Sequence, residues 1–161
     1  MAGNTEFFVS SGAAFTVASG GAFFADAANL GEDQLKQIWN QGTINVAGTV
    51  TLGAINLSAV QGSNFNITDG GSLSIHMCDL KNQGQFLVSL GGNVTADCGG
   101  QFINDLGTIT NAGSILITAD GAKLENRTNS TITNNGVITI NGYYQNNGTY
   151  TGTPYGGTPL Q

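Results

Sequence analysis

The sequence has few charged residues, and positive charge is the scarcest. Only 9% of the 161 residues are charged, and four Lys and Arg residues stand against ten Asp and Glu residues. The net charge of −6 leaves no basic surface that could neutralise phosphates, so we expect no nucleic-acid partner.

Long apolar runs are also missing. No stretch of about 20 apolar residues occurs, so the sequence predicts no transmembrane helix and no insertion into a membrane. The start, Met1 to Glu6, has no basic region that leads into an apolar stretch, which is the pattern of a secretory signal peptide. The export route therefore stays open.

Side chains that perform catalysis or bind metals are rare. The chain has one histidine, His76, and two cysteines, Cys78 and Cys98, with no Cys-x-x-Cys pair, so no zinc motif is present. His76 and Cys78 would share a strand face, but neither an orienting partner nor an oxyanion site accompanies them. We expect no enzymatic activity, no metal and no cofactor.

Glycine, in contrast, is abundant, with 25 residues, and it recurs with a fixed period. Two glycine columns repeat every 21 residues: Gly71, Gly92 and Gly113 in one, Gly100, Gly121 and Gly142 in the other. The repeating units cover residues 40–60, 61–81, 82–103, 104–125 and 126–146, with a partial sixth from Asn147. A fixed period of this size is the signature of a repeat architecture.

Apolar residues recur in step with the glycines. They form three columns: Ile44, Phe65, Phe86, Ile109 and Ile132; Leu52, Leu73, Val94, Ile115 and Val137; and, more loosely, Phe102, Leu124 and Tyr144. Alternation of apolar and polar residues within each unit predicts short strands, and three strands joined by corners make one triangular coil. An antiparallel sandwich is disfavoured because its turn signals come only every 8 to 12 residues or so. The sequence therefore predicts an all-β fold, a parallel β-solenoid (β-helix) of about five to six coils with about 21–23 residues each.

The corners carry asparagine and aspartate beside glycine. These residues adopt positive φ at low cost, and stacked asparagines can also form hydrogen-bonded ladders, so both a turn role and a ladder role are open. Asp97 and Asp120 fall in one corner column with Asn141. We interpret them as turn residues, with a cation bound at that corner as the alternative.

The whole chain, residues 1–161, is predicted to be one domain with four parts. Residues 1–28 form an N-terminal strand segment or an extra coil, residues 40–152 the solenoid coils and residues 153–161 a C-terminal tail. Residues 29–39 are predicted to form a capping helix, because Asn29 and Glu32 fit a capping box and Leu35, Ile38 and Trp39 would share a face.

The two cysteines are about one coil apart. Cys78 and Cys98 are separated by 20 residues, so they can lie on adjacent layers at a distance that a disulfide accepts. They are one residue out of step with the period of 21, which favours two free thiols. Both alternatives stay open.

A stack of coils has two ends with unpaired backbone, and a soluble monomer must cap both. Only the helix is a visible cap, so we predict that subunits stack head to tail into a homopolymer, with residues 1–25 available to pair onto a neighbour. The candidate assembly contacts are aromatic: Phe7, Phe15, Phe23, Trp39, Tyr143, Tyr144, Tyr150 and Tyr155.

Strings such as Asn146-Asn-Gly-Thr-Tyr and Thr131-Ile-Thr-Asn-Asn-Gly recur along residues 40–151. They resemble the Asn-Gly-Thr-Ile repeats of bacterial β-strand-repeat surface proteins and filamentous-haemagglutinin-type adhesins. The resemblance implies a β-solenoid at the cell surface or outside the cell. This chain lacks the N-terminal secretion domain of those larger proteins, so a repeated subunit is expected here.

The sequence thus predicts a structural subunit of an extracellular fibre or of a surface or biofilm-matrix filament, with surface polysaccharide as a further partner. A virion fibre or spike, and a carbohydrate-binding or carbohydrate-cleaving β-helix, are the alternatives. A carbohydrate-cleaving enzyme would need a carboxylate pair with basic and aromatic residues around it, and no such set is visible.

Overall fold

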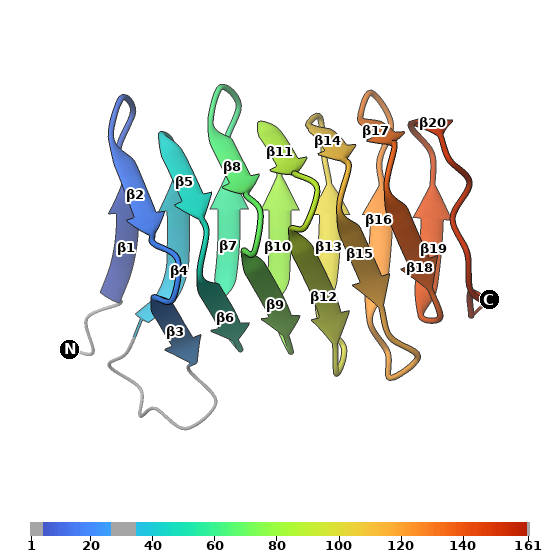
Figure 1. The fold of residues 1–161 in the computed structure, drawn as a ribbon, viewed down its shortest axis with the longest axis horizontal. Helices are drawn as coiled ribbons and strands as arrows, with labels where there is room; N and C mark the ends of the chain where they lie inside the picture. Colours follow the sequence, from blue (N-terminus) through green and yellow to red (C-terminus); the bar gives the residue numbers. More distant parts are fainter. Residues whose placement is uncertain (1–4, 27–34, 161) are drawn as a thin grey trace.

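The chain folds into a parallel β-solenoid, in which three sheets run along the long axis of the molecule (Figure 1). The computed structural model describes residues 5–26 and 35–160. Every strand pair is parallel, and each strand pairs with strands three elements before or after it in the chain. The predicted fold class is confirmed. The strands give six complete coils and a seventh coil of two strands.

Each coil contributes one strand to each sheet. Sheet A contains β1 (Thr5–Val9), β4 (Leu35–Asn40), β7 (Asn56–Ala59), β10 (Asp79–Asn82), β13 (Gln101–Asn104), β16 (Lys123–Asn126) and β19 (Tyr143–Asn146). Sheet B contains β2 (Ala14–Val17), β5 (Thr43–Val46), β8 (Asn64–Ile67), β11 (Gln85–Val88), β14 (Thr108–Asn111), β17 (Thr131–Asn134) and β20 (Thr149–Gly152). Sheet C contains β3 (Ala22–Asp26), β6 (Thr49–Gly53), β9 (Ser72–His76), β12 (Asn93–Asp97), β15 (Ser114–Ile117) and β18 (Val137–Ile140).

The core is a set of apolar columns, one residue per coil, inside the three sheets. The column of sheet A is Phe7, Ile38, Leu57, Leu80, Phe102, Leu124 and Tyr144. The column of sheet B is Phe15, Ile44, Phe65, Phe86, Ile109, Ile132 and Tyr150. The column of sheet C is Phe23, Val50, Leu73, Val94, Ile115 and Ile138. All three columns begin with phenylalanine, and those of sheets A and B end with tyrosine.

Two predicted columns are confirmed, and the third is wrong at both ends. Leu52 pairs with Ile75, not with Leu73, and Val137 pairs with Ser114 and is 59% exposed. The inward residue of β18 is Ile138. The corners differ in length by one or two residues, which moves such positions to the opposite face of a strand.

A buried asparagine ladder runs along the corner between sheets A and B. Asn82, Asn104, Asn126 and Asn146 are in register, and each of the first three donates from Nδ2 to Oδ1 of the next over 2.8–2.9 Å. Asn111 and Asn134 form a shorter ladder at the end of sheet B. Ladders therefore accompany the turn role that asparagine was expected to have.

Coils approach one another so closely at the corners that only glycine fits. A Cβ atom on Gly142 would lie 2.3 Å from the carbonyl oxygens of Thr118 and Ala122. The corner between sheets C and A is different, because Ala54, Met77 and Cys98 occupy it in three successive coils with φ of 52°, 53° and 45°. Residues other than glycine rarely adopt this left-handed region.

The predicted capping helix is wrong where it can be compared with the structure. Leu35–Asn40 is strand β4, and Ile38 is buried between the adjacent coils, while Trp39 lies on the outer face. Residues 29–34 of that prediction lie outside the described residues. The described residues contain no helix with the length and apolar character needed to cross a membrane.

Candidate functional site

The first coil ends in a cluster of three phenylalanine rings. Phe7, Phe15 and Phe23 come from β1, β2 and β3, and their ring centroids are 5.1–5.9 Å apart. Each ring occupies a core position, yet it is only partly buried, whereas Phe65 and Phe86 in the middle of the stack are fully buried. These three rings, named here the Phe end, close the core with apolar surface that a further coil could cover.

The backbone at the Phe end is also unpaired on one side. β1, β2 and β3 are the terminal strands of their sheets and pair only with β4, β5 and β6 among the described residues. Residues 5–26 thus form a coil of the solenoid, and no strand of this segment is detached from it. An edge of parallel strands presents a row of donors and acceptors to which another chain can pair.

The opposite end carries tyrosines in the same positions. Tyr144 and Tyr150 complete the columns of sheets A and B, and the ring of Tyr155 lies 4.7 Å from Tyr144 and 6.2 Å from Tyr150. Burial raises the pKa of Tyr144 to about 12 and also raises that of Tyr150. Tyr150 donates from its hydroxyl to the carbonyl of Thr153. These three residues are named here the Tyr end.

The C-terminal segment continues the coil beyond the Tyr end. Gly156 forms a parallel bridge to Thr139 at the edge of sheet C, and Leu160 forms one to Tyr143 at the edge of sheet A. The predicted tail therefore contacts the last coil at two points and leaves β20 of sheet B unpaired on its outer side among the described residues.

Two predicted contact residues do not belong to either end. Trp39 lies on the outer face of sheet A, where its ring stacks on that of Phe8 with centroids 6.4 Å apart. Tyr143 is 43% exposed on the outer face of β19. The structure thus gathers six of the eight predicted aromatic contacts into two opposite clusters and places these two on the side.

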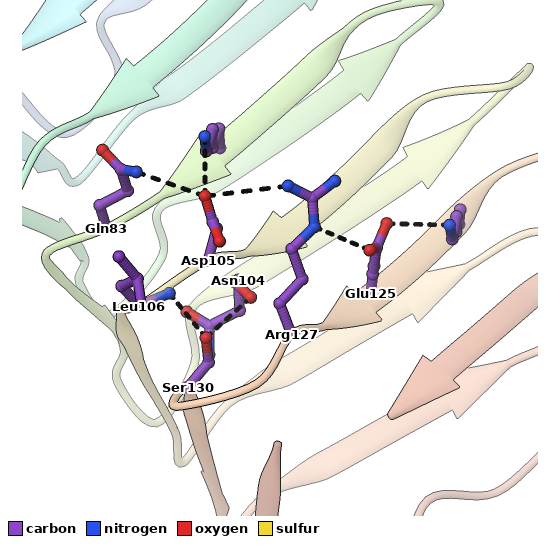
Figure 2. Close-up of polar contacts among 9 residues, drawn as sticks. Gln83, Asn104, Asp105, Leu106, Glu125, Arg127 and Ser130 are labelled. Atoms are coloured by element: carbon purple, nitrogen blue, oxygen red, sulfur yellow. Dashed lines mark hydrogen bonds and ion pairs between the residues drawn. The ribbon is translucent and has the colours of Figure 1, made fainter. Parts of the chain in front are cut away.

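Charge is concentrated on the outer side of sheet A in the later coils. Arg127 lies between Asp105 and Glu125, with its Nε donating to Glu125 over 2.7 Å (Figure 2). Lys81 pairs with Asp105 at 2.7 Å and Lys123 with Glu125 at 2.9 Å. These contacts lower the pKa of both carboxyl groups, for Glu125 chiefly through Arg127 and for Asp105 chiefly through Lys81. The three described cations are therefore engaged in ion pairs along the stack.

The two cysteines are free thiols on opposite sides of the chain. Cys78 is buried and its Sγ donates to the carbonyl of Leu52, and burial raises its pKa to about 11. Cys98 is exposed at the corner and its Sγ donates to Asp120 Oδ2, a hydrogen bond that raises the thiol pKa. Of the two alternatives, the structure has the free thiols.

Sequence reasoning paired His76 with the wrong cysteine. His76 Nδ1 lies 2.8 Å from Asp97 Oδ1, and Cys98 follows Asp97 directly, so that the three side chains form one cluster. The spacing of His76 and Asp97 is 21 residues, one period of the repeat, and this was the signal that could have found the cluster.

No family model matches the chain, so the resemblance to β-strand-repeat surface proteins has no family match behind it. No curated protein matches it either. Among solved structures, the crystal structure of a TibC-catalysed hyper-glycosylated TibA fragment is similar to 96% of this chain and 77% of that chain, with 17% sequence identity and a TM-score of 0.35. A likeness at this TM-score carries no argument about what the chain does.

Proposed function

We propose that the protein is a structural subunit that stacks head to tail into a filament outside the cell. The observation that carries this proposal is the pair of open ends. Phenylalanine rings occupy the core positions of the first coil and tyrosine rings those of the last, and all six are incompletely covered. Joining a Phe end to a Tyr end would bury both sets and continue the core columns from one molecule into the next.

The parallel arrangement makes the proposed junction directional. Within the molecule each strand pairs in parallel with its copy one coil away. A Phe end that docks on a Tyr end repeats the same parallel pairing, with β2 next to β20. Two identical ends would instead meet with their coils winding in opposite senses, so this geometry favours chains over closed dimers.

The side surface supports a role outside the cell. It is rich in hydroxyl and amide groups, and the whole sequence has four Lys and Arg residues, which leaves few sites for trypsin-like proteases. A role as a building block also needs no catalytic group, and we propose that the protein is not an enzyme. Its proposed principal partner is a second copy of itself.

Electron microscopy of the purified protein at increasing concentration tests this proposal. We expect filaments many subunits long for the natural chain. Phe15→Asp places a charge in the Phe end and should prevent assembly, because the carboxylate would be buried at the junction. Phe24→Asp is the matched control, since Phe24 lies in the same coil but is 71% exposed on the outer face, and its filaments should persist.

A mixing experiment separates a blocked end from a misfolded subunit. A Phe15→Asp subunit keeps an intact Tyr end, so it can join the Phe end of a growing filament and stop growth there. Small amounts of it should therefore shorten the filaments of the natural protein. A natural protein that stays monomeric at all concentrations, or filaments that form equally well from Phe15→Asp, would contradict the proposal.

A further inference from the structure

The corner between sheets C and A gathers the rare coordinating side chains of the molecule. His76 ends β9, Asp97 ends β12 directly opposite it in the next coil, and Cys98 is the first residue of the corner. One ligand atom from each of the three lies within 4.8 Å of the other two. The only histidine of the chain and one of its two cysteines thus meet at one point.

A second carboxylate flanks this group from the following coil. Asp120 Oδ2 lies 3.2 Å from Cys98 Sγ, and its Oδ1 accepts a hydrogen bond from the hydroxyl of Thr118. Neither Asp97 nor Asp120 forms an ion pair with Lys or Arg among the described residues, whose cations lie with Asp105 and Glu125. The corner therefore holds two carboxylates without a neighbouring cationic Lys or Arg.

We propose that His76, Asp97 and Cys98, with Asp120 beside them, bind a divalent transition-metal ion of the zinc class. Imidazole nitrogen, carboxylate oxygen and thiolate sulfur are the ligand types that zinc combines in tetrahedral sites. The thiolate distinguishes such an ion from calcium and magnesium, which take oxygen ligands.

The geometry of the corner suits this donor set. Tetrahedral zinc, with bonds of about 2.0–2.3 Å, holds its ligand atoms roughly 3.3–3.8 Å apart, so the three side chains need to close only by about an ångström. They have room to do so, because the side chains of His76 and Asp97 are 38% and 32% exposed and Cys98 is exposed. Their backbones are fixed by the ladder of β9 and β12, and the exposed corner gives the ion access from solvent.

Binding replaces the thiol proton by the metal. The S–H bond of Cys98 breaks, its electron pair forms the S–metal bond, and the proton leaves to solvent, with no change in oxidation state. The metal also exchanges the contact between Cys98 and Asp120 for two bonds to one cation. Because the ligands come from successive coils, a bound ion should raise the thermal stability of the stack.

Cobalt titration of the full chain under reducing conditions tests this proposal. Co²⁺ bound by a thiolate gives a sulfur-to-cobalt charge-transfer band in the near ultraviolet, and Zn²⁺ should then displace the cobalt and remove the band. We expect Cys98→Ser to abolish the band and His76→Gln to weaken metal binding by about 10-fold or more. Cys78→Ala is the matched control, because Cys78 is buried away from the corner, and it should bind cobalt as the natural chain does.

Each result decides the question. Circular dichroism first establishes that Cys98→Ser and His76→Gln fold, which we expect for two partly exposed or exposed positions. Saturable binding that is lost in these two variants and kept in Cys78→Ala supports the site. Absence of saturable binding at millimolar Co²⁺ or Zn²⁺, or equal binding by all four proteins, overturns it.

Discussion

Asn104 donates from Nδ2 to Oδ1 of Asn126 over 2.9 Å, from one coil to the next, at a place where neither side chain is exposed. The same amide group also donates to the carbonyl of Thr131, 3.0 Å away, on the far side of the corner. Asn82 makes the equivalent pair of contacts with Asn104 and Thr108 one coil earlier. These asparagines therefore fix both the stacking of coils and the direction in which the chain turns from sheet A to sheet B.

Replacing Asn104 by alanine should destabilise the fold markedly. The change deprives the Nδ2 group of Asn82 of one acceptor and removes the donors to Asn126 and Thr131. Buried polar groups left without partners cost about 1–3 kcal/mol each, so we expect a clear fall in the thermal midpoint. Gln145→Ala is the control, since Gln145 is an exposed residue of the same sheet, and equal losses in the two variants would refute the importance of the ladder.

Glycine at the tight corners should not tolerate a methyl group. Gly142→Ala brings Cβ within 2.3 Å of two carbonyl oxygens, which the neighbouring coil cannot avoid without moving its backbone. We expect a loss of about 1–3 kcal/mol in the free energy of unfolding, as is usual for overpacked sites. Gly156→Ala, whose Cβ would have nothing within 4 Å, should melt at the same temperature as the natural chain. A neutral Gly142→Ala would show that the corners are looser than the structure has them.

Acid should weaken the ion pairs beside sheet A. The pKa of Glu125 is lowered in the folded chain, chiefly by its hydrogen bond with Arg127. A carboxyl with a lowered folded pKa contributes stability that is present above its unfolded pKa and lost as the pH falls through the folded value. The natural chain should therefore lose more stability between neutral pH and about pH 3 than Glu125→Gln does, by up to about 1 kcal/mol. Glu6→Gln, at an exposed carboxyl, should retain the dependence of the natural chain, and identical curves for all three proteins would contradict the assignment.

The repeat made most of the fold predictable. The columns of Phe65 and Phe102 follow from a constant period, because identical corners place the same face of each strand inward. The helix prediction failed at Ile38 and Trp39 because a short apolar segment fits either period, and pairing with the next coil decided between them. Nothing in the local sequence reports that pairing.

The candidate sites were predictable to different degrees. Phe7, Phe15 and Phe23 are eight residues apart, one strand and one corner each, so their meeting at one end follows once their segment is known to be a coil. The cluster at His76 requires the exact register of β9 and β12 and the outward position of Cys98, which depends on its unusual φ. A backbone conformation that glycine would normally supply cannot be expected from a cysteine.

Each strand in this molecule pairs only with strands one coil away, such as β11 with β8 and β14. No contact ties the first coil to the last, so cooperativity has to pass from neighbour to neighbour, as it does in other linear repeats. Melting can begin by fraying at either terminus and need not be all-or-none. In a filament the termini of most subunits would be internal, and the same chain would then unfold as part of a much longer cooperative array.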